Sequence, residues 1–432
     1  MGVDTLFADP ELRHSLSEEL HARAFHDFDG AGRFIRFVYL VGNDDSKVVK
    51  YVNKYLRSRK LSEMPDTAKF YRVDLTGFAL RIERHTEFLT ISFVEKGLRV
   101  KSGVSKNSFD ESRLSHMPFK WAQDAPASLF HSIWVEVGGV PPINLSQSKM
   151  LKILGSRAVA SNNFSENAAQ VHFAFDIDSN GYSRVVIFNS SIEATRMGRV
   201  VQRVVEIETY RLLALLGLSA VKKYSGRLSS IEDVLNGLTS DLAQEIKKPD
   251  GHVQPLLTIL SSQAADVEDI YSRTSYRLAA TKAYRGILTG RLERMQMTRL
   301  SGFQGVRGFL DRRMTPAMDS CMAFSDRLSS LSSRLNRAGA LLRTQTELVI
   351  QRQNRDLLHS MDQRAKQQLR LQQTVERLSI AAVTYYGVGL VGYVASSFPI
   401  DQWGLTITLM EALSVPLIAI AVWLAIRKVK EK

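Results

Sequence analysis

Alternating apolar and polar residues dominate the first half of the chain. RFIRFVYLVG (33–42) predicts a strand, and KVVKYVNKYLRS (47–58) has the spacing of an amphipathic helix. Residues 70–96, FYRVDLTGFALRIERHTEFLTISFVEK, alternate as two or three half-buried antiparallel strands do, and HSIWVEVGG, AQVHFAFDID and SRVVIFN extend the predicted sheet. The pattern therefore predicts an α+β fold that begins with an α/β cytoplasmic domain over residues 1–190.

From Ile192 the apolar spacing becomes helical, which predicts long helices over residues 191–377. A heptad-like seam within this region suggests a coiled coil. Its members are Leu328, Leu331, Leu335, Ala338 and Leu342. Two interpretations remain open: a helical hairpin that packs on its own domain, and a coiled-coil-like stalk that self-associates.

Two apolar runs close the chain. Residues 378–398 contain no charged side chain, and at about 1.5 Å per residue they span roughly 30 Å, the thickness of the bilayer hydrocarbon. Residues 404–426 contain one charge, so the two runs predict a transmembrane hairpin with the lipid bilayer as its environment. The basic tail, residues 427–432, places both termini in the cytoplasm by the positive-inside rule.

Small residues mark one face of the first predicted span. Gly387, Gly389 and Gly392 match the dinucleotide fingerprint G-x-G-x-x-G, but no strand precedes them, so we interpret them as packing residues. Tyr385, Gly389, Gly392 and Ser396 fall at helical spacing on one face. Because small residues allow close approach of neighbouring helices, this face is a candidate helix-packing or pore-lining surface.

Two carboxylates belong to the predicted hairpin. Asp401 lies in the short loop between the spans, at the expected outer mouth. Glu411 lies inside the second span, where a carboxylate is costly unless it is paired, protonated or hydrated. It could accept a hydrogen bond from Thr384, Tyr385 or Tyr386, or it could contact a cation in a water-filled path.

Charge and cysteine content narrow the class of protein. The net charge of +13 is concentrated in residues 251–432, which hold 24 Lys and Arg against 14 Asp and Glu. No nucleic-acid-binding motif accompanies this excess, so orientation in the membrane and anionic lipid headgroups explain it more simply. The single cysteine, Cys321, excludes an intrachain disulfide and agrees with a reducing compartment. The first residues lack the pattern of a signal peptide.

Motifs for catalysis and cofactor binding are missing from the pattern. There is no Walker loop, nucleophile elbow or kinase motif set, and we expect neither an enzyme nor a bound cofactor. His21 and His26 lie near carboxylates and could bind a metal or a phosphate, although local polar packing is the simpler interpretation. Asp176 and Asp178 occupy calcium-loop positions, but Ile187 stands where a glutamate is required, which favours a hairpin turn.

Three segments together resemble a bacterial family of uncharacterised membrane-anchored proteins. They are ELHARAF near the start, GYSRVVIFNSSIEATRMGRVVQRVVEIETYRLLALLGL in the middle, and the C-terminal hairpin. Ala24 departs from the proline that we expect after HAR. The resemblance implies a membrane anchor in the bacterial cytoplasmic (inner) membrane and implies no activity.

The order of segments also resembles CorA-type divalent cation transporters, which have a cytoplasmic α/β domain, a long helix, two spans and a basic tail. That resemblance implies a homo-oligomer, specifically a pentamer, with Tyr385, Gly389, Gly392 and Ser396 facing a pore. The family's Gly-Met-Asn signature is absent, and GYVASSF (392–398) stands in its place. We therefore expect a self-associating, CorA-like protein that is an ion channel or divalent cation transporter. The alternative is a membrane-anchored scaffold or sensor whose cytoplasmic domain binds a partner.

Overall fold

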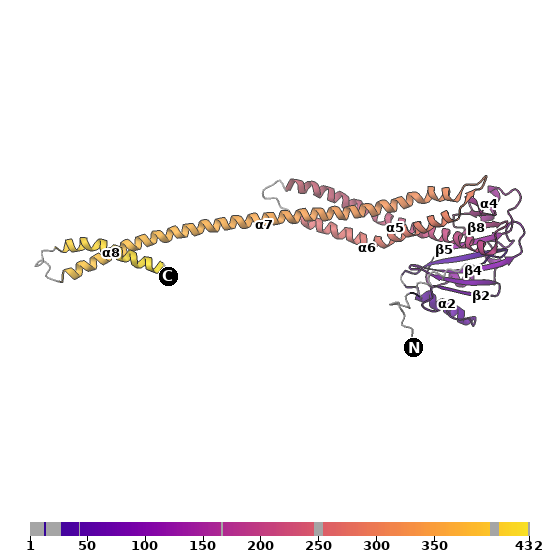
Figure 1. The fold of residues 1–432 in the computed structure, drawn as a ribbon, viewed down its shortest axis with the longest axis horizontal. Coiled ribbons are helices and arrows are strands. Elements are labelled where there is room, and N and C mark those ends of the chain that lie inside the picture. The colour runs from indigo at the N-terminus through magenta and orange to yellow at the C-terminus, as the bar shows by residue number, and fades with distance from the viewer. Residues whose placement is uncertain are drawn as a thin grey trace, which may run out of the picture. The chain divides into compact units, whose positions relative to one another are not determined.

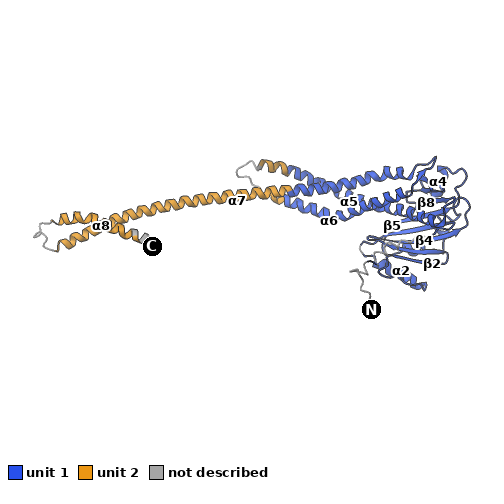
Figure 2. Ribbon diagram, viewed as in Figure 1, with its two compact units in different colours: residues 1–237, 260–336 blue, residues 238–259, 337–432 orange. Residues whose placement is uncertain are grey.

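The computed structural model confirms the predicted order of an N-terminal α/β sheet domain, long helices and two apolar C-terminal helices (Figure 1). The chain forms two compact units, and the long helices contribute residues to both (Figure 2). Unit 1 comprises residues 1–237 and 260–336, and unit 2 comprises residues 238–259 and 337–432. The structure describes residue 13 and residues 27–42, 44–165, 167–245, 254–397 and 406–430.

One mixed sheet forms the centre of unit 1. Within the described residues it has nine strands in the order β2-β3-β4-β1-β5-β8-β7-β6-β9. The strands are β1 Ala31–Leu40, β2 Phe70–Leu75, β3 Phe78–Arg84, β4 Phe88–Leu98, β5 Ser128–Gly138, β6 Ala160–Phe164, β7 Ala169–Phe173, β8 Tyr182–Asn189 and β9 Thr298–Arg299. β1 pairs antiparallel with both β4 and β5, and β5 pairs parallel with β8.

Short helices lie between the strands in the first part of the chain, and long helices follow strand β8. The helices are η1 Glu111–Arg113, α2 Ser46–Ser58, α3 Phe119–Gln123, α4 Gln147–Leu154, α5 Ala194–Glu245, α6 Gln254–Arg294, α7 Val306–Ala395 and α8 Ile407–Lys430. By length and composition, the end of α7 and residues 407–426 of α8 could each cross a membrane. These two helices are the candidate membrane spans.

Strand β1 is buried on both faces because each face of the sheet has its own layer of helices. Phe34 and Val38 belong to the cluster that includes residues of α5, α6 and α7. Ile35, Phe37 and Tyr39 belong to the cluster that includes residues of α2, α3 and α4. Since side chains alternate between the faces of a strand, this arrangement explains why every position of β1 other than Arg33 and Arg36 is uncharged.

The heptad-like seam of α7 packs within the protein itself over its first part. Leu328, Leu331 and Leu335 are buried in unit 1. Arg327 of the same helix turn contacts Glu232 of α5 at 2.6 Å. The own-domain interpretation therefore holds for this stretch. Further along, in unit 2, residues 351–375 of α7 are almost entirely exposed.

This difference along α7 can be measured with two leucines. Leu335 is 3% exposed and Leu369 is 56% exposed. We expect Leu335→Ala to lower the free energy of unfolding of unit 1 by about 2–5 kcal/mol, because it leaves a cavity in a packed core. The matched control, Leu369→Ala, should change this free energy by less than about 0.5 kcal/mol. Urea unfolding of the full chain in detergent, followed by the fluorescence of the buried Trp134, measures both; equal losses would contradict the assignment.

Candidate functional sites

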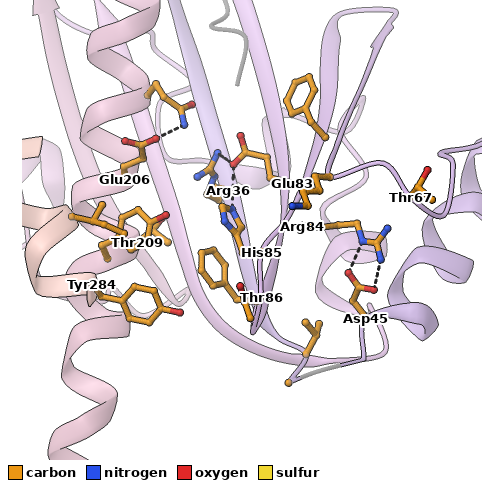
Figure 3. A pocket seen from close by; sticks show the side chains of 18 of the residues that line it. Arg36, Asp45, Thr67, Glu83, Arg84, His85, Thr86, Glu206, Thr209 and Tyr284 are labelled. Atoms are coloured by element: carbon orange, nitrogen blue, oxygen red, sulfur yellow. Dashed lines mark hydrogen bonds and ion pairs between the residues drawn. The ribbon is translucent and has the colours of Figure 1, made fainter. Parts of the chain in front are cut away.

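A polar pocket with a volume of about 520 Å³ opens in unit 1. Strands β1, β3 and β4 form one wall, α5 and α6 another, and the segment before α2 a third. Figure 3 shows Glu206, Thr209 and Tyr284 on the helical side, with Arg84 and Asp45 on the opposite side. The pocket is large enough for a small polar molecule.

A buried ion cluster forms the floor of this pocket. Arg36 Nη2 contacts Glu83 Oε2 at 2.9 Å, and Arg36 Nε donates to Ser92 Oγ at 3.1 Å. Arg81 contacts the other oxygen of the Glu83 carboxylate. Burial alone would raise the pKa of Glu83, but Arg36, His85 and Arg81 together hold this pKa below its ordinary value of 4.5. Glu83 is therefore a carboxylate at neutral pH, shared between two buried guanidinium groups.

A second carboxylate ties the pocket to helix α6. Glu87, in the turn between β3 and β4, contacts Arg277 through both oxygens, at 3.0 and 2.8 Å. Tyr284 Oη donates to Glu87 Oε1 at 2.5 Å. Burial and the nearby Glu87 carboxylate raise the pKa of Tyr284, so it remains a hydrogen-bond donor at neutral pH. Any movement of the β3–β4 turn is thus coupled to α6 by charge-assisted hydrogen bonds.

Two buried polar atoms of pocket-lining residues make no hydrogen bond within the described part of the chain. His85 stacks on Phe88 with ring centroids 4.0 Å apart. Its Nε2 lies 3.9 Å from Glu83 Oε2, close enough for an ion pair when the ring is protonated, and it has no hydrogen-bond partner among the described residues. Gln202 Oε1 also lacks a partner within the described part of the chain, although its Nε2 donates to Glu206. A ligand with both donor and acceptor groups would satisfy both atoms.

No metal site accompanies the pocket: among the described residues, no group of three His, Cys, Asp or Glu side chains could hold a metal ion. Asp178 has a structural role instead. Its Oδ1 accepts from the backbone N–H of Asn180 and Tyr182, and its Oδ2 contacts Arg184 at 2.5 Å. The predicted hairpin turn is confirmed, because β7 pairs antiparallel with β8 and Gly181 has a φ of +88°. His21 and His26 lie outside the described residues.

The predicted small-residue face of α7 is divided in the structure: one part of it packs against α8, and another part is exposed. A Cβ atom built on Gly392 would overlap the carboxylate of Glu411, so α7 and α8 approach each other closely there. Gly387 takes the same role against Ile418, with a Cβ contact of 2.9 Å. Gly389, by contrast, has nothing within 4 Å of its Cβ position.

The other predicted residues of this face, Tyr385 and Ser396, are exposed. Tyr385 is 76% exposed and contacts Tyr386 edge to face. Ser396 is exposed, and its Oγ donates to the backbone oxygen of Tyr393. Thr384 Oγ1 is buried and has no hydrogen-bond partner within the described residues. Glu411 therefore packs against glycine rather than against the hydroxyl groups considered for it, and Asp401 lies outside the described residues.

Sequence reasoning missed the pocket. Its signal was the presence of charged residues inside apolar strands, namely Arg36, Arg81 and Glu83. Charged side chains at buried strand positions must find partners, and such clusters gather at functional sites. The sequence did not indicate which of these residues would meet.

The role of Glu83 can be tested by neutralising it. We expect Glu83→Gln to lower the free energy of unfolding at pH 7 by about 3–5 kcal/mol, because it leaves two buried guanidinium groups without a counter-charge. Asp74→Asn is the matched control, since Asp74 is 69% exposed in its ion pair with Arg72 on the same sheet. Its free energy of unfolding should stay close to that of the unmodified protein.

The same variant has a defined pH dependence. The pKa of Glu83 is lower in the folded than in the unfolded chain, so its carboxylate stabilises the fold above about pH 4.5, and this contribution is lost as the pH falls further. The difference between the unmodified protein and Glu83→Gln should therefore shrink from pH 7 to pH 4 in urea unfolding experiments. A difference that stays constant or grows would show that the charge of Glu83 is not responsible.

The packing of the candidate spans provides a further test. Gly392→Val should push Glu411 away and separate α7 from α8, whereas Gly389→Val should leave the hairpin intact. Spin labels at Val394 and Leu409, in a Cys321→Ala background, report the distance between the helices when labelled chains are diluted with unlabelled ones in nanodiscs. We expect a longer or broader distance distribution for Gly392→Val, and its recovery when Glu411→Ala is added. Identical effects of the two valines would contradict this packing.

Comparison with known proteins places the chain in a family. No curated protein matches the sequence. Residues 8–432 match the model of DUF3422, which is described as a protein of unknown function. The match spans both compact units and includes both candidate membrane spans. The chain belongs to the DUF3422 family.

Proposed function

We propose that the chain is a membrane-anchored, self-associating protein of the scaffold or sensor class. Its two apolar helices anchor it in the bacterial cytoplasmic membrane, and both termini and the α/β unit lie in the cytoplasm. One observation carries the proposal. Helix α7 begins among the core residues of unit 1, exposes apolar side chains over residues 350–375, and ends as a candidate span. Exposed apolar residues along such a helix are typical of an association surface.

The pocket of unit 1 supports a sensing role. Two atoms of its lining residues, His85 Nε2 on the β3–β4 side and Gln202 Oε1 on α5, have no hydrogen-bond partner among the residues that the structure describes. The Glu87 contacts with Arg277 and Tyr284 join the same turn to α6. A small polar molecule that binds more tightly to one arrangement of these elements would shift the population toward it.

Ion conduction on the CorA-like plan is the second candidate function. The observation that favours it is Glu411, a carboxylate within a candidate span. On this plan five copies would surround a pore, the exposed face with Tyr385 and Gly389 would line it, and a divalent cation would be the substrate. The absent Gly-Met-Asn signature and the packing of Glu411 against Gly392 weigh against it.

Reconstitution separates these two functions. We expect the full chain in nanodiscs to form particles with more than one copy, measured by mass photometry, because the exposed apolar residues of α7 require a cover. In liposomes we expect Mg²⁺ and K⁺ flux at the level of empty vesicles for both the unmodified protein and Glu411→Gln. Particles with one copy would contradict self-association. Cation flux that Glu411→Gln reduces would replace the scaffold or sensor function by conduction.

A further inference from the structure

The exposed part of α7 follows one heptad frame. With Asn354 counted as position a, positions a and d hold the apolar residues Ile350, Leu357, Met361, Leu371, Val375 and Leu378, all of them exposed. Asn354, Arg364 and Gln368 are the polar exceptions. A repeat of 3.5 residues sustained over four heptads is typical of a helix that supercoils around a partner.

With one exception, charged residues are absent from the a and d positions of this frame and from the e and g positions beside them. Nine charged residues lie between positions 350 and 379, and eight of them occupy positions b, c and f. The exception is Arg364. The flanking e and g positions hold only uncharged residues: Gln351, Gln353, Leu358, Ser360, Ala365, Gln367, Gln372, Thr374 and Ser379. Ion pairs such as Lys366 with Asp362 at 2.7 Å lie on the opposite face.

This distribution of charge identifies the partner. Charges at e and g positions select oppositely charged partners and repel identical helices that carry the same sign. Uncharged e and g positions neither select a partner of opposite charge nor repel an identical helix, so they are compatible with a partner of the same sequence. Leucine at three of the five d positions (Leu357, Leu371 and Leu378) and valine at a (Val375) match the preference of two-stranded parallel coiled coils, whereas Ile350 and Arg364 at the other two d positions do not.

The frame continues into the first candidate span as far as Gly389. Ala382 and Gly389 fall at position a and Tyr385 falls at position d, whereas the next d position, Gly392, packs against Glu411 of α8. Tyr385 and Gly389 are exposed, and among the described residues no atom beyond the local helix lies within 4 Å of a Cβ built on Gly389. A partner that covers both segments must therefore cross the membrane beside α7 in the same register. A second copy of the chain does so, and its own hairpin fixes the same direction.

We propose that α7 of two copies pairs in parallel and in register along this frame, from Ile350 into the bilayer at Gly389. The inference rests on the self-association in the proposed function and adds the partner, the direction and the contacting face. Asn354, at a buried a position of the pair, fixes the register, since amide groups in such seams are satisfied only by each other.

Cysteine cross-linking of the full chain tests this arrangement. Cys321 is the single native cysteine and is buried in unit 1, so Cys321→Ala provides the background. Leu357→Cys and Leu371→Cys probe position d, and His359→Cys and Gln373→Cys probe position f as matched controls. After oxidation with copper phenanthroline in liposomes, the d variants should give severalfold more disulfide-linked dimer than the f variants. The two d positions keep the test valid if one substitution weakens the pair.

Each other outcome overturns a defined part of the inference. Equal linking at d and f positions, with particles of more than one copy, would reject the frame and leave self-association standing. Linking at neither d position in such particles would reject parallel, in-register pairing. Particles with a single copy by mass photometry of the Cys321→Ala protein would reject self-association, and the inference with it. The mass measurement thus separates failure of the proposed function from failure of the pairing geometry.

Discussion

Unit 1 depends on the neutralisation of two arginines in its central strand. Arg33 and Arg36 both lie in β1, on opposite faces of a sheet that is covered on both sides, and both are buried. Taking a guanidinium group out of water costs several kcal/mol unless a carboxylate with good geometry meets it. Each face therefore requires a glutamate at the level of its arginine. Glu95 and Glu136 come from β4 and β5, which pair with β1, and Glu83 comes from β3, one strand further away.

The two faces solve this problem differently. On one face Arg33 contacts Glu95 at 3.2 Å and Glu136 at 3.4 Å. Burial raises the pKa of Glu136 to about 7 despite Arg33, so this carboxyl group is partly protonated near neutral pH and its oxygen accepts from Trp134 Nε1. On the other face Arg36 meets Glu83, whose pKa is lowered, and a pocket opens beside the pair. The pocket therefore lies on the face of the sheet where the buried glutamate, Glu83, stays charged at neutral pH.

The sequence predicted local structure well and long-range partners poorly, for physical reasons. Strand alternation in residues 33–42 and 70–96 and the turn at Gly181 depend on neighbouring residues only, so they could be recognised. The pocket depends on contacts between residues 47 positions apart, for Arg36 with Glu83, and 190 positions apart, for Glu87 with Arg277. No local pattern encodes such pairs. The heptad seam near Leu335 was ambiguous because own-domain packing and self-association require the same spacing.

Helix α7 passes through three environments, and its apolar residues lie on a different face in the first than in the second. Its leucines up to Leu335 meet helices of the same unit, those from Leu357 onward are exposed, and its last turns are apolar enough for lipid. In the last segment the glycines divide the roles: Gly392 admits Glu411 of α8, while Gly389 leaves its own face open. Gly389 and Gly392 are three residues apart on one face of α7, and the spacing of the exposed leucines continues through Tyr385 to Gly392. The contact of Gly392 with Glu411 therefore ends the open stretch of this face, so the hairpin can form within one chain while the surface at Gly389 stays available to a neighbour.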